Sequence, residues 1–384
     1  MSITTASCVA KGLDCGELKT FFEPDADVAG LGVIIAFAAV TFSACVLSAL
    51  YWLLQVYFEI VPRSSDRPGR RQRRDAYQAA FAERLSWFEI IENVIISFSD
   101  QQLFVGVAWG IALQFLGGCE TTAYHYNIIT HMLIMTCATH LVAIAVVRKY
   151  WKSPAAAVPR VLVSLAVYVL TGMCFINQQA AFPSSFDRND PPDNRFIQYA
   201  VCYQTGNTTV ENLITNSAAN PNAVIFESVS GSTVIANWNL YVILLVCYAI
   251  ALLRLVVFGL ASCIRSRPNP PRRSPQTSLK ILRSFDAFLQ LFMLAVGFVV
   301  SAFAYRYIVD LREYLSKFDR ESDTEPNDEA GFDGYGQLIP LMLMLLTTFQ
   351  IIGDLSVKFY EWKSRPEEKV QAVKTELGGH HSGR

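Results

Sequence analysis

Hydrophobic residues in this chain gather in long blocks, with shorter polar segments between them. A helix needs about 20 mostly apolar residues to cross the hydrocarbon core of a bilayer, because each residue advances the helix by about 1.5 Å. Block length therefore distinguishes a membrane-spanning helix from a buried soluble one, where periodicity does not. The pattern predicts an all-α, polytopic membrane protein with seven transmembrane helices, at residues 28–57, 94–116, 124–147, 158–181, 238–264, 285–308 and 337–357.

The composition agrees with a membrane domain over residues 28–357. Hydrophobic residues make up 52% of the chain and charged residues 17%, whereas a soluble domain carries about 25% charged residues. The lipid bilayer is thus the first expected partner. Residues 1–27 lack the basic start and short apolar core of a secretory signal, so we expect them to stay on the protein as an N-terminal arm.

Basic residues predict the orientation of the helices. Of the 32 Lys and Arg residues, 23 fall on one side of the predicted membrane domain, in residues 61–93, 148–160, 265–284 and 358–384. The positive-inside rule places this side in the cytoplasm, which puts the N-terminus outside and the C-terminus inside. The outer loops are then 182–237 and the acidic 310–334, and the tail 358–384 is expected to be a disordered cytoplasmic tail.

The inner loops 61–93 and 265–284 predict contacts at the cytoplasmic surface. Their Lys and Arg residues suit the anionic lipid of that leaflet, and we assign them to lipid rather than to a nucleic acid. The stretch from Arg74 to Ile95 has apolar residues at helical spacing and is expected to lie along the inner membrane face before the second span begins. A docking site for a cytosolic signalling partner is the alternative. We expect this membrane to be the plasma membrane or an endomembrane of the secretory pathway.

Four of the nine cysteines lie on the predicted outer side, which is oxidising in the secretory pathway. Four cysteines allow three pairings, and position favours Cys119 with Cys202 and Cys8 with Cys15; four free thiols are the alternative. A bridge from the third span to the second outer loop resembles, in topology, that of heptahelical receptors. Asn207 opens an Asn-Thr-Thr triplet on the same side, so N-glycosylation is chemically allowed there.

Polar residues inside the predicted spans are the candidate functional residues. A charged side chain at the centre of a transmembrane helix costs roughly 2.5–3.5 kcal/mol on insertion scales. The second span nevertheless contains Asp100, Gln101 and Gln102. The other candidates in the cytoplasmic half of the spans are His140, Arg254, Asp286, Gln290 and Asp354, while Tyr124, His125 and His131 belong to the outer part of the third span.

Asp100 is expected to face the bundle interior and to pair with His140 or, failing that, with Arg254. Asp286 and Gln290 are four residues apart and therefore share a helix face. A purely structural network is the leading interpretation of these residues. A relay or gate that responds to protons or a ligand is the second, and catalysis is the weakest.

Known membrane chemistries are not supported by the motifs. The three histidines of the third span, at 125, 131 and 140, are spaced six and nine residues apart, so they do not form the same-face pair that a zinc site uses. The seventh block has no lysine for retinal, and no nucleophile elbow, phosphate loop or dinucleotide fingerprint occurs. We therefore expect no enzymatic activity, no metal and no cofactor.

Two segments resemble a family. The stretches "SDQQLFVGVAWGIALQF" and "YHYNIITHMLIMTCATHLVAIAVVRKYW" resemble a group of fungal polytopic membrane proteins of unassigned function. The shared pattern is Ser-Asp-Gln-Gln at 99–102, Tyr-His at 124–125, and Thr-His-Leu at 139–141 followed by Arg148. The resemblance implies a polytopic fold and marks these residues as a site, and it implies no activity.

The leading expectation is a receptor-like sensor or signalling component that couples a ligand or pH change outside to the basic inner segments. The first alternative is a channel or proton-coupled transporter, because membrane-embedded Asp and His residues often relay protons. A structural membrane scaffold is the second alternative.

Overall fold

The structure is a computed structural model, and it describes residues 25–60, 71–116, 119–147, 154–178, 182–184, 186, 193–203, 237–265 and 276–319. Its described elements are helical. In chain order they are α2 (Ala26–Ala29), α3 (Leu31–Ile60), α4 (Arg71–Ile111), the π-helix η1 (Ala112–Leu116), α5 (Ala123–Val146), α6 (Pro154–Asn177), the 3-10 helices η3 (Asn194–Phe196) and η4 (Ala200–Tyr203), α9 (Trp238–Arg265) and α10 (Gln276–Asp319).

Six of the described helices are long and apolar enough to cross a membrane, which confirms the membrane class and six of the predicted spans. The spans are Leu31–Tyr57, Phe88–Phe115, Ala123–Val146, Ala157–Asn177, Trp238–Val257 and Ser284–Lys317. The seventh predicted span, 337–357, lies outside the described residues together with Asp354.

Three predicted loops are partly helical. Residues 71–93 belong to α4, 276–284 begin α10, and 310–319 end it. The prediction that 74–95 forms a separate helix along the membrane surface is wrong, because one continuous helix runs from Arg71 to Ile111. The physical reason is that the polar residues flanking these apolar blocks are mostly good helix formers without proline, so the helix continues where hydropathy stops.

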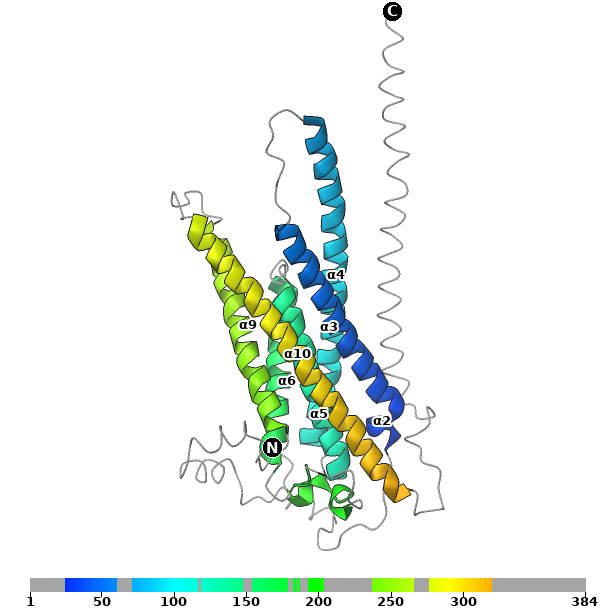
Figure 1. The fold of residues 1–384 in the computed structure, drawn as a ribbon. Helices are drawn as coiled ribbons and strands as arrows, with labels where there is room; N and C mark the ends of the chain where they lie inside the picture. Colours follow the sequence, from blue (N-terminus) through cyan, green and yellow to red (C-terminus); the bar gives the residue numbers. More distant parts are fainter. Residues whose placement is uncertain are drawn as a thin grey trace, which may run out of the picture.

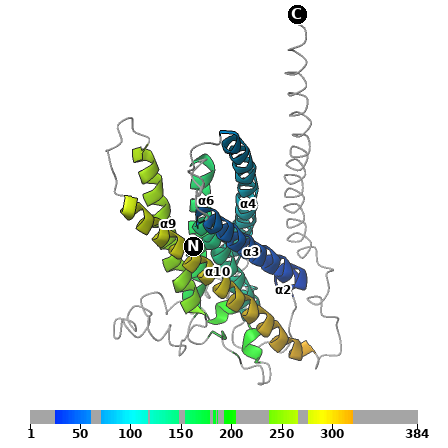
Figure 2. The same ribbon diagram turned by 45° about the horizontal axis from the view of Figure 1, so that its top comes forward.

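Helix α5 is the centre of the molecule. All 24 of its residues are buried. Five helices surround it, and each contacts the next in a closed ring in the order α3, α4, α6, α9, α10 and back to α3. Figure 1 shows the long α10 running obliquely across this bundle, and Figure 2 shows the same crossing from a tilted view.

Glycine allows α10 to approach α5 closely. A Cβ atom at Gly297 would lie 2.3 Å from Cγ2 of Val142 and 3.4 Å from the carbonyl oxygen of Ala138. Small residues let helix backbones approach each other in membranes, where close packing replaces the hydrophobic driving force between helices. Gly297 therefore fixes the crossing point of the two helices.

The two ends of the bundle differ. We call the end next to the basic segments 61–70 and 266–275 the basic end, and the opposite one the cap end. At the cap end, the described parts of residues 182–203 pack over α5, and we call them the cap. The aromatic rings of Phe186 and Tyr314 stack there, with centroids 5.0 Å apart. The cap thereby joins the end of α10 to the bundle.

A short antiparallel contact fastens the cap to the start of α5. Thr122 and Tyr199 form a β-bridge, and the amide of Ala123 donates to the carbonyl of Gln198 at 2.8 Å. Cys119 and Cys202 each lie three residues beyond this bridge, on the same side of it, and both are disulfide-bonded. The register thus matches the predicted Cys119–Cys202 pair. Cys8, Cys15 and Asn207 lie outside the described residues.

Candidate functional site: polar contacts around the central helix

The Asp100 carboxylate binds Arg160, which corrects the predicted pairing with His140 or Arg254. Nε of Arg160 lies 2.9 and 2.8 Å from the two carboxylate oxygens, and its Nη2 lies 2.7 Å from one of them. The contact joins α4 to α6. A guanidinium is always charged and offers several donors in a fork that fits a carboxylate, whereas a neutral imidazole offers one donor.

Sequence reasoning missed Arg160 because it counted this residue among the loop cations. In the structure α6 begins at Pro154, so Arg160 already lies in its second turn. The side chains of Arg160 and Asp100 are 28% and 25% exposed. Proline is well tolerated in the first turn of a helix, and Pro154 in a basic segment was the available signal for this earlier start.

His140 contacts Ser99 instead of Asp100. Its Nδ1 lies 2.7 Å from the Ser99 hydroxyl oxygen, which joins α5 to α4. The residue is 1% exposed, and its Nε2 has no hydrogen-bond partner in the structure. The His140 ring faces Tyr248 of α9, with ring centroids 6.1 Å apart.

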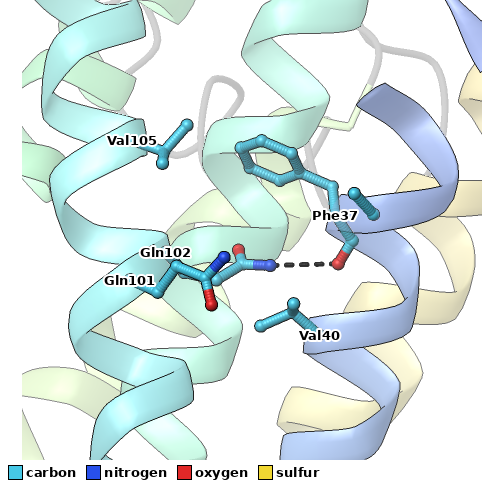
Figure 3. A pocket seen from close by; sticks show the side chains of 6 residues that line it. Phe37, Val40, Gln101, Gln102 and Val105 are labelled. Carbon is cyan, nitrogen blue, oxygen red and sulfur yellow. Dashed lines mark hydrogen bonds between the residues drawn. The ribbon is translucent and has the colours of Figure 1, made fainter. Parts of the chain in front are cut away.

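Gln102 joins three helices, as Figure 3 shows in part. Its amide nitrogen donates to the carbonyl of Phe37 at 3.0 Å and to the hydroxyl of Thr41 at 3.1 Å, both on α3. Its amide oxygen accepts from the Thr136 hydroxyl of α5 at 3.3 Å. Gln102 thereby connects α4 to a backbone carbonyl of α3 and to hydroxyl groups of α3 and α5.

A small pocket lies beside Gln102, between α3 and α4. Its volume is about 20 Å³, which is room for about one water molecule. Figure 3 shows the half-buried Gln101 at this pocket, opposite Val40. The full lining is Ala36, Phe37, Val40, Gln101, Gln102 and Val105. The side chains of the Ser-Asp-Gln-Gln segment contact different helices: Ser99 contacts α5, Asp100 contacts α6 and Gln102 contacts α3.

Arg254 of α9 pairs with Asp286 of α10. Its Nε lies 2.5 Å from one carboxylate oxygen and its Nη2 lies 3.2 Å from the other. Its Nη1 donates to the carbonyl of Ala145 in the last turn of α5. A cation is favourable there, because the last carbonyls of a helix carry partial negative charge. Gln290 donates to Asp286 at 3.2 Å, which confirms that these two share a face.

Glu92 is a site residue that sequence reasoning missed. It is buried in α4 and accepts a short hydrogen bond from the Tyr51 hydroxyl of α3. The prediction placed it in an inner loop, because it precedes the apolar block that starts at 94. The absence of proline and glycine from residues 71–93 was the signal for a longer helix.

These contacts form a belt around α5. Four of the five neighbouring pairs in the ring of helices are joined by polar side chains, and we call this set the polar belt: Tyr51–Glu92 (α3–α4), Asp100–Arg160 (α4–α6), Ser164–Tyr248 (α6–α9) and Arg254–Asp286 (α9–α10). The fifth pair, α10–α3, is joined by the Phe42 ring against Phe298 and Tyr305. The belt lies from the middle of the bundle toward its basic end.

The histidines of the cap half are enclosed. His131 is 1% exposed; its Nδ1 lies 2.8 Å from the carbonyl of Asn127, and its Nε2 lies 2.8 Å from the amide nitrogen of Asn237. The carbonyl can only accept and the amide can only donate, so the ring is neutral with its proton on Nδ1. It stacks on Tyr307 at 3.9 Å.

The other two residues predicted at the outer end of α5 are also buried, Tyr124 fully and His125 nearly so. The Thr122 hydroxyl accepts from the backbone amide of His125 and lies 2.8 Å from its Nδ1, so this pair caps the helix start. These residues are therefore buried rather than on an open outer face.

Neutral hydrogen bonds hold the cap on α5 and α10. Asn127, which sequence reasoning did not single out, donates to the carbonyl of Pro183 at 2.9 Å, and Tyr307 donates to the carbonyl of Ser184 at 2.7 Å. Tyr203 donates to the carbonyl of Arg195, and burial raises the pKa of Tyr203 to about 12 because desolvation disfavours the phenolate. The described part of the cap is thus held over the bundle by neutral hydrogen bonds.

Within the described residues, no group of three or more His, Cys, Asp or Glu side chains is arranged to hold a metal ion. What the site offers chemically is a set of paired charges and one buried histidine with a free nitrogen. No protein-family model, no curated protein and no solved structure matches this chain.

Proposed function

We propose that this chain is a receptor-like sensor or signalling component of a membrane, without catalytic activity. In this proposal the cap end faces outside, the basic end faces the cytoplasm, and residues 337–357 form a seventh span. The excess of basic residues at one end supports this orientation. The disulfide-bonded state of Cys119 and Cys202 supports placing the cap on the oxidising side of a plasma membrane or a secretory endomembrane.

The observation that carries the proposal is the continuous connection through α5. At the cap end, Asn127 and His131 bind the cap and the start of α9. At the basic end, His140 binds α4, and Ala145 receives the Arg254 side chain of the polar belt. Because α5 is buried along its whole length, a displacement of the cap reaches the belt through one packed element.

The belt supplies the part that switches. Ion pairs between neighbouring helices hold one arrangement, and a change in charge or in helix position exchanges them for another. The basic segments that follow α3 and α9 lie next to these pairs in the sequence, and they are where anionic lipid or a cytosolic signalling partner would bind. The predicted Cys8–Cys15 bridge and Asn207 glycan belong to the same outside face in this proposal.

A distance measurement across the basic end tests the sensor. Fluorophores carried by unnatural amino acids at Val158 of α6 and Phe285 of α10, both exposed on the bundle surface, report the separation of these helices in nanodiscs. Asn127→Ala cuts a bond between α5 and the cap. We expect Asn127→Ala to change the distance between the two fluorophores at the basic end. Asp100→Asn removes a charge from the polar belt itself and should change the same distance.

The matched control is Ile243→Ala, which trims a lipid-exposed side chain in the cap half of α9. If Asn127→Ala and this control leave the same distance distribution as the natural chain, the two ends are not coupled and the sensor proposal fails.

A proton-coupled transporter is the second candidate, and the free Nε2 of His140 favours it. A relay needs a titratable group whose proton can move, and His140 is buried inside the bundle. Proton flux into vesicles that contain the purified chain, lost in the His140→Gln variant, would support transport. Equal leakage in vesicles with and without the protein would exclude it.

A further inference from the structure

Two histidines on α5 have the same burial and different bonding. His131 and His140 are each 1% exposed. Both nitrogens of His131 bind protein groups, whereas His140 binds Ser99 through Nδ1 alone. A buried polar atom without a hydrogen bond destabilises the fold, so such an atom calls for a partner.

No protonation state of His140 removes this requirement. If the Ser99 hydroxyl donates to Nδ1, the ring proton is on Nε2, which then needs an acceptor. If Nδ1 donates to Ser99, then Nε2 is a lone-pair acceptor that needs a donor. An imidazolium has a proton on both nitrogens and again leaves Nε2 as a donor. No described residue supplies this partner, and a bound molecule can.

The surroundings of His140 define what that molecule is. The Tyr248 ring lies 6.1 Å from the imidazole, and its hydroxyl forms a short hydrogen bond with Ser164 of α6. The nearest charges along α4 and α6 are Asp100 and Arg160, which already satisfy each other. A neutral molecule that can both donate and accept fits this environment, and water is the smallest such molecule.

We propose that a water molecule binds in the protein core at His140 Nε2, against the Tyr248–Ser164 pair. It completes a hydrogen-bonded chain that runs from Ser99 of α4 through His140 of α5 to Tyr248 of α9 and Ser164 of α6. A single buried water commonly makes about three such bonds. This site goes beyond the sensor function, since it is required whether the chain senses or transports.

Water-edited solid-state NMR tests the site on the full chain in lipid bilayers, with ¹³C,¹⁵N-labelled histidine. Magnetisation that starts on water reaches a ring only when water is in contact with it. We expect early, strong transfer to His140 and little to His131, which is equally buried and serves as the internal control. The His140→Gln variant assigns the signals by removing one set. Transfer to His140 that is no greater than to His131 overturns the proposal.

Tyr248→Phe locates the water. The phenylalanine keeps the ring and removes the hydroxyl, so transfer to His140 should fall several-fold while the ¹⁵N shifts of His131 stay the same and show an intact fold. Unchanged transfer overturns the placement against Tyr248. A ¹⁵N chemical shift that indicates a hydrogen bond at Nε2, without magnetisation transfer from water, also counts against the proposal, because another molecule then occupies the site. Should the variant fail to fold, the comparison of the two histidines in the natural chain still decides.

Discussion

The cap half and the basic half of α5 are held by different kinds of contact. In the cap half, His131 and Asn127 make neutral hydrogen bonds, and His131 stacks on the ring of Tyr307. In the basic half, the surrounding helices are tied by charges, Asp100 with Arg160 and Arg254 with Asp286. A hydrogen bond between membrane helices contributes about 0.6 kcal/mol on average, whereas separating a buried ion pair by removing one partner costs about 3–5 kcal/mol. Apart from the disulfide-bonded cysteines of the cap, the cap half is therefore held by weak neutral bonds, and the basic half by a few strong ones that a change in charge can release.

The sharpest test of this difference is Asp100→Leu, which leaves the Arg160 guanidinium without its partner. We expect a loss of about 3–5 kcal/mol in the free energy of unfolding, measured by denaturation in detergent micelles. The double variant with Arg160→Leu should recover most of it, because neither charge is then stranded. Phe104→Leu, on the exposed side of the same helix, is the control and should cost little. A double variant as unstable as the single one would show that the charges are not a pair.

The covalent fastening of the cap is expected to have the next largest effect. Cys119→Ser should lower stability by about 2–4 kcal/mol, because the bond closes a loop of the chain in the unfolded state. Adding Cys202→Ser should cost nothing further if the two cysteines are partners. Peptide mapping under non-reducing conditions should recover both in one linked species. Recovery of both cysteines as free thiols would show that no covalent bond fastens the cap.

Gly297→Ala tests the crossing point between the two halves. The new methyl group would press on Val142, and overpacking of this kind costs about 1–3 kcal/mol. Val142→Ala should relieve the clash when combined with it. Thermal unfolding of both variants, beside the lipid-exposed control Val299→Ala, measures the effect. An equal loss in the control variant would mean that α10 and α5 are not in close contact there.

The smallest effect is expected for Asn237, which donates to His131 and has a positive φ of 64°. Asn237→Gly removes the amide and keeps the backbone conformation available, so it should cost only about 0.6–2 kcal/mol in stability. Asn237→Ala should cost about 1 kcal/mol more, because alanine is strained in the left-handed region. The same unfolding assay measures both. Equal stability of the two variants would contradict the backbone strain of alanine at this position. A loss of stability larger than that of Asp100→Leu would show that the stronger single contacts lie in the cap half.

The helices were predictable because hydropathy over about 20 residues is a strong signal. The pairing of polar residues was less predictable from the sequence. The grouping by depth included Arg254 and Asp286, which do pair, and the four-residue spacing correctly joined Asp286 to Gln290. Depth alone does not say which helices are neighbours, so Asp100 was matched with the wrong cations. The order of helices around α5 decides that match, and it depends on packing of the whole bundle.

Helix ends explain the other errors. Arg160 and Glu92 were read as loop residues because each lies near the edge of an apolar block. Both are in helices that begin before the block does, since helix formation and lipid contact follow different rules. The burial of Tyr124 and His125 was likewise beyond reach, because a long polar loop gives no indication of where it folds back.

The length of α10 has a mechanical consequence. Its 44 residues span about 66 Å at 1.5 Å per residue, more than twice the roughly 30 Å of the hydrocarbon core. Close contact at Gly297 makes the helix a lever on a fulcrum: Asp286 lies about 16 Å to one side and Tyr314 about 25 Å to the other. A tilt that moves Tyr314 in one direction moves Asp286 in the opposite one, over about two thirds of the distance. Helices longer than the bilayer adjust their tilt to its thickness, so a thinner or thicker membrane would pull on the Arg254–Asp286 pair with no ligand bound at all.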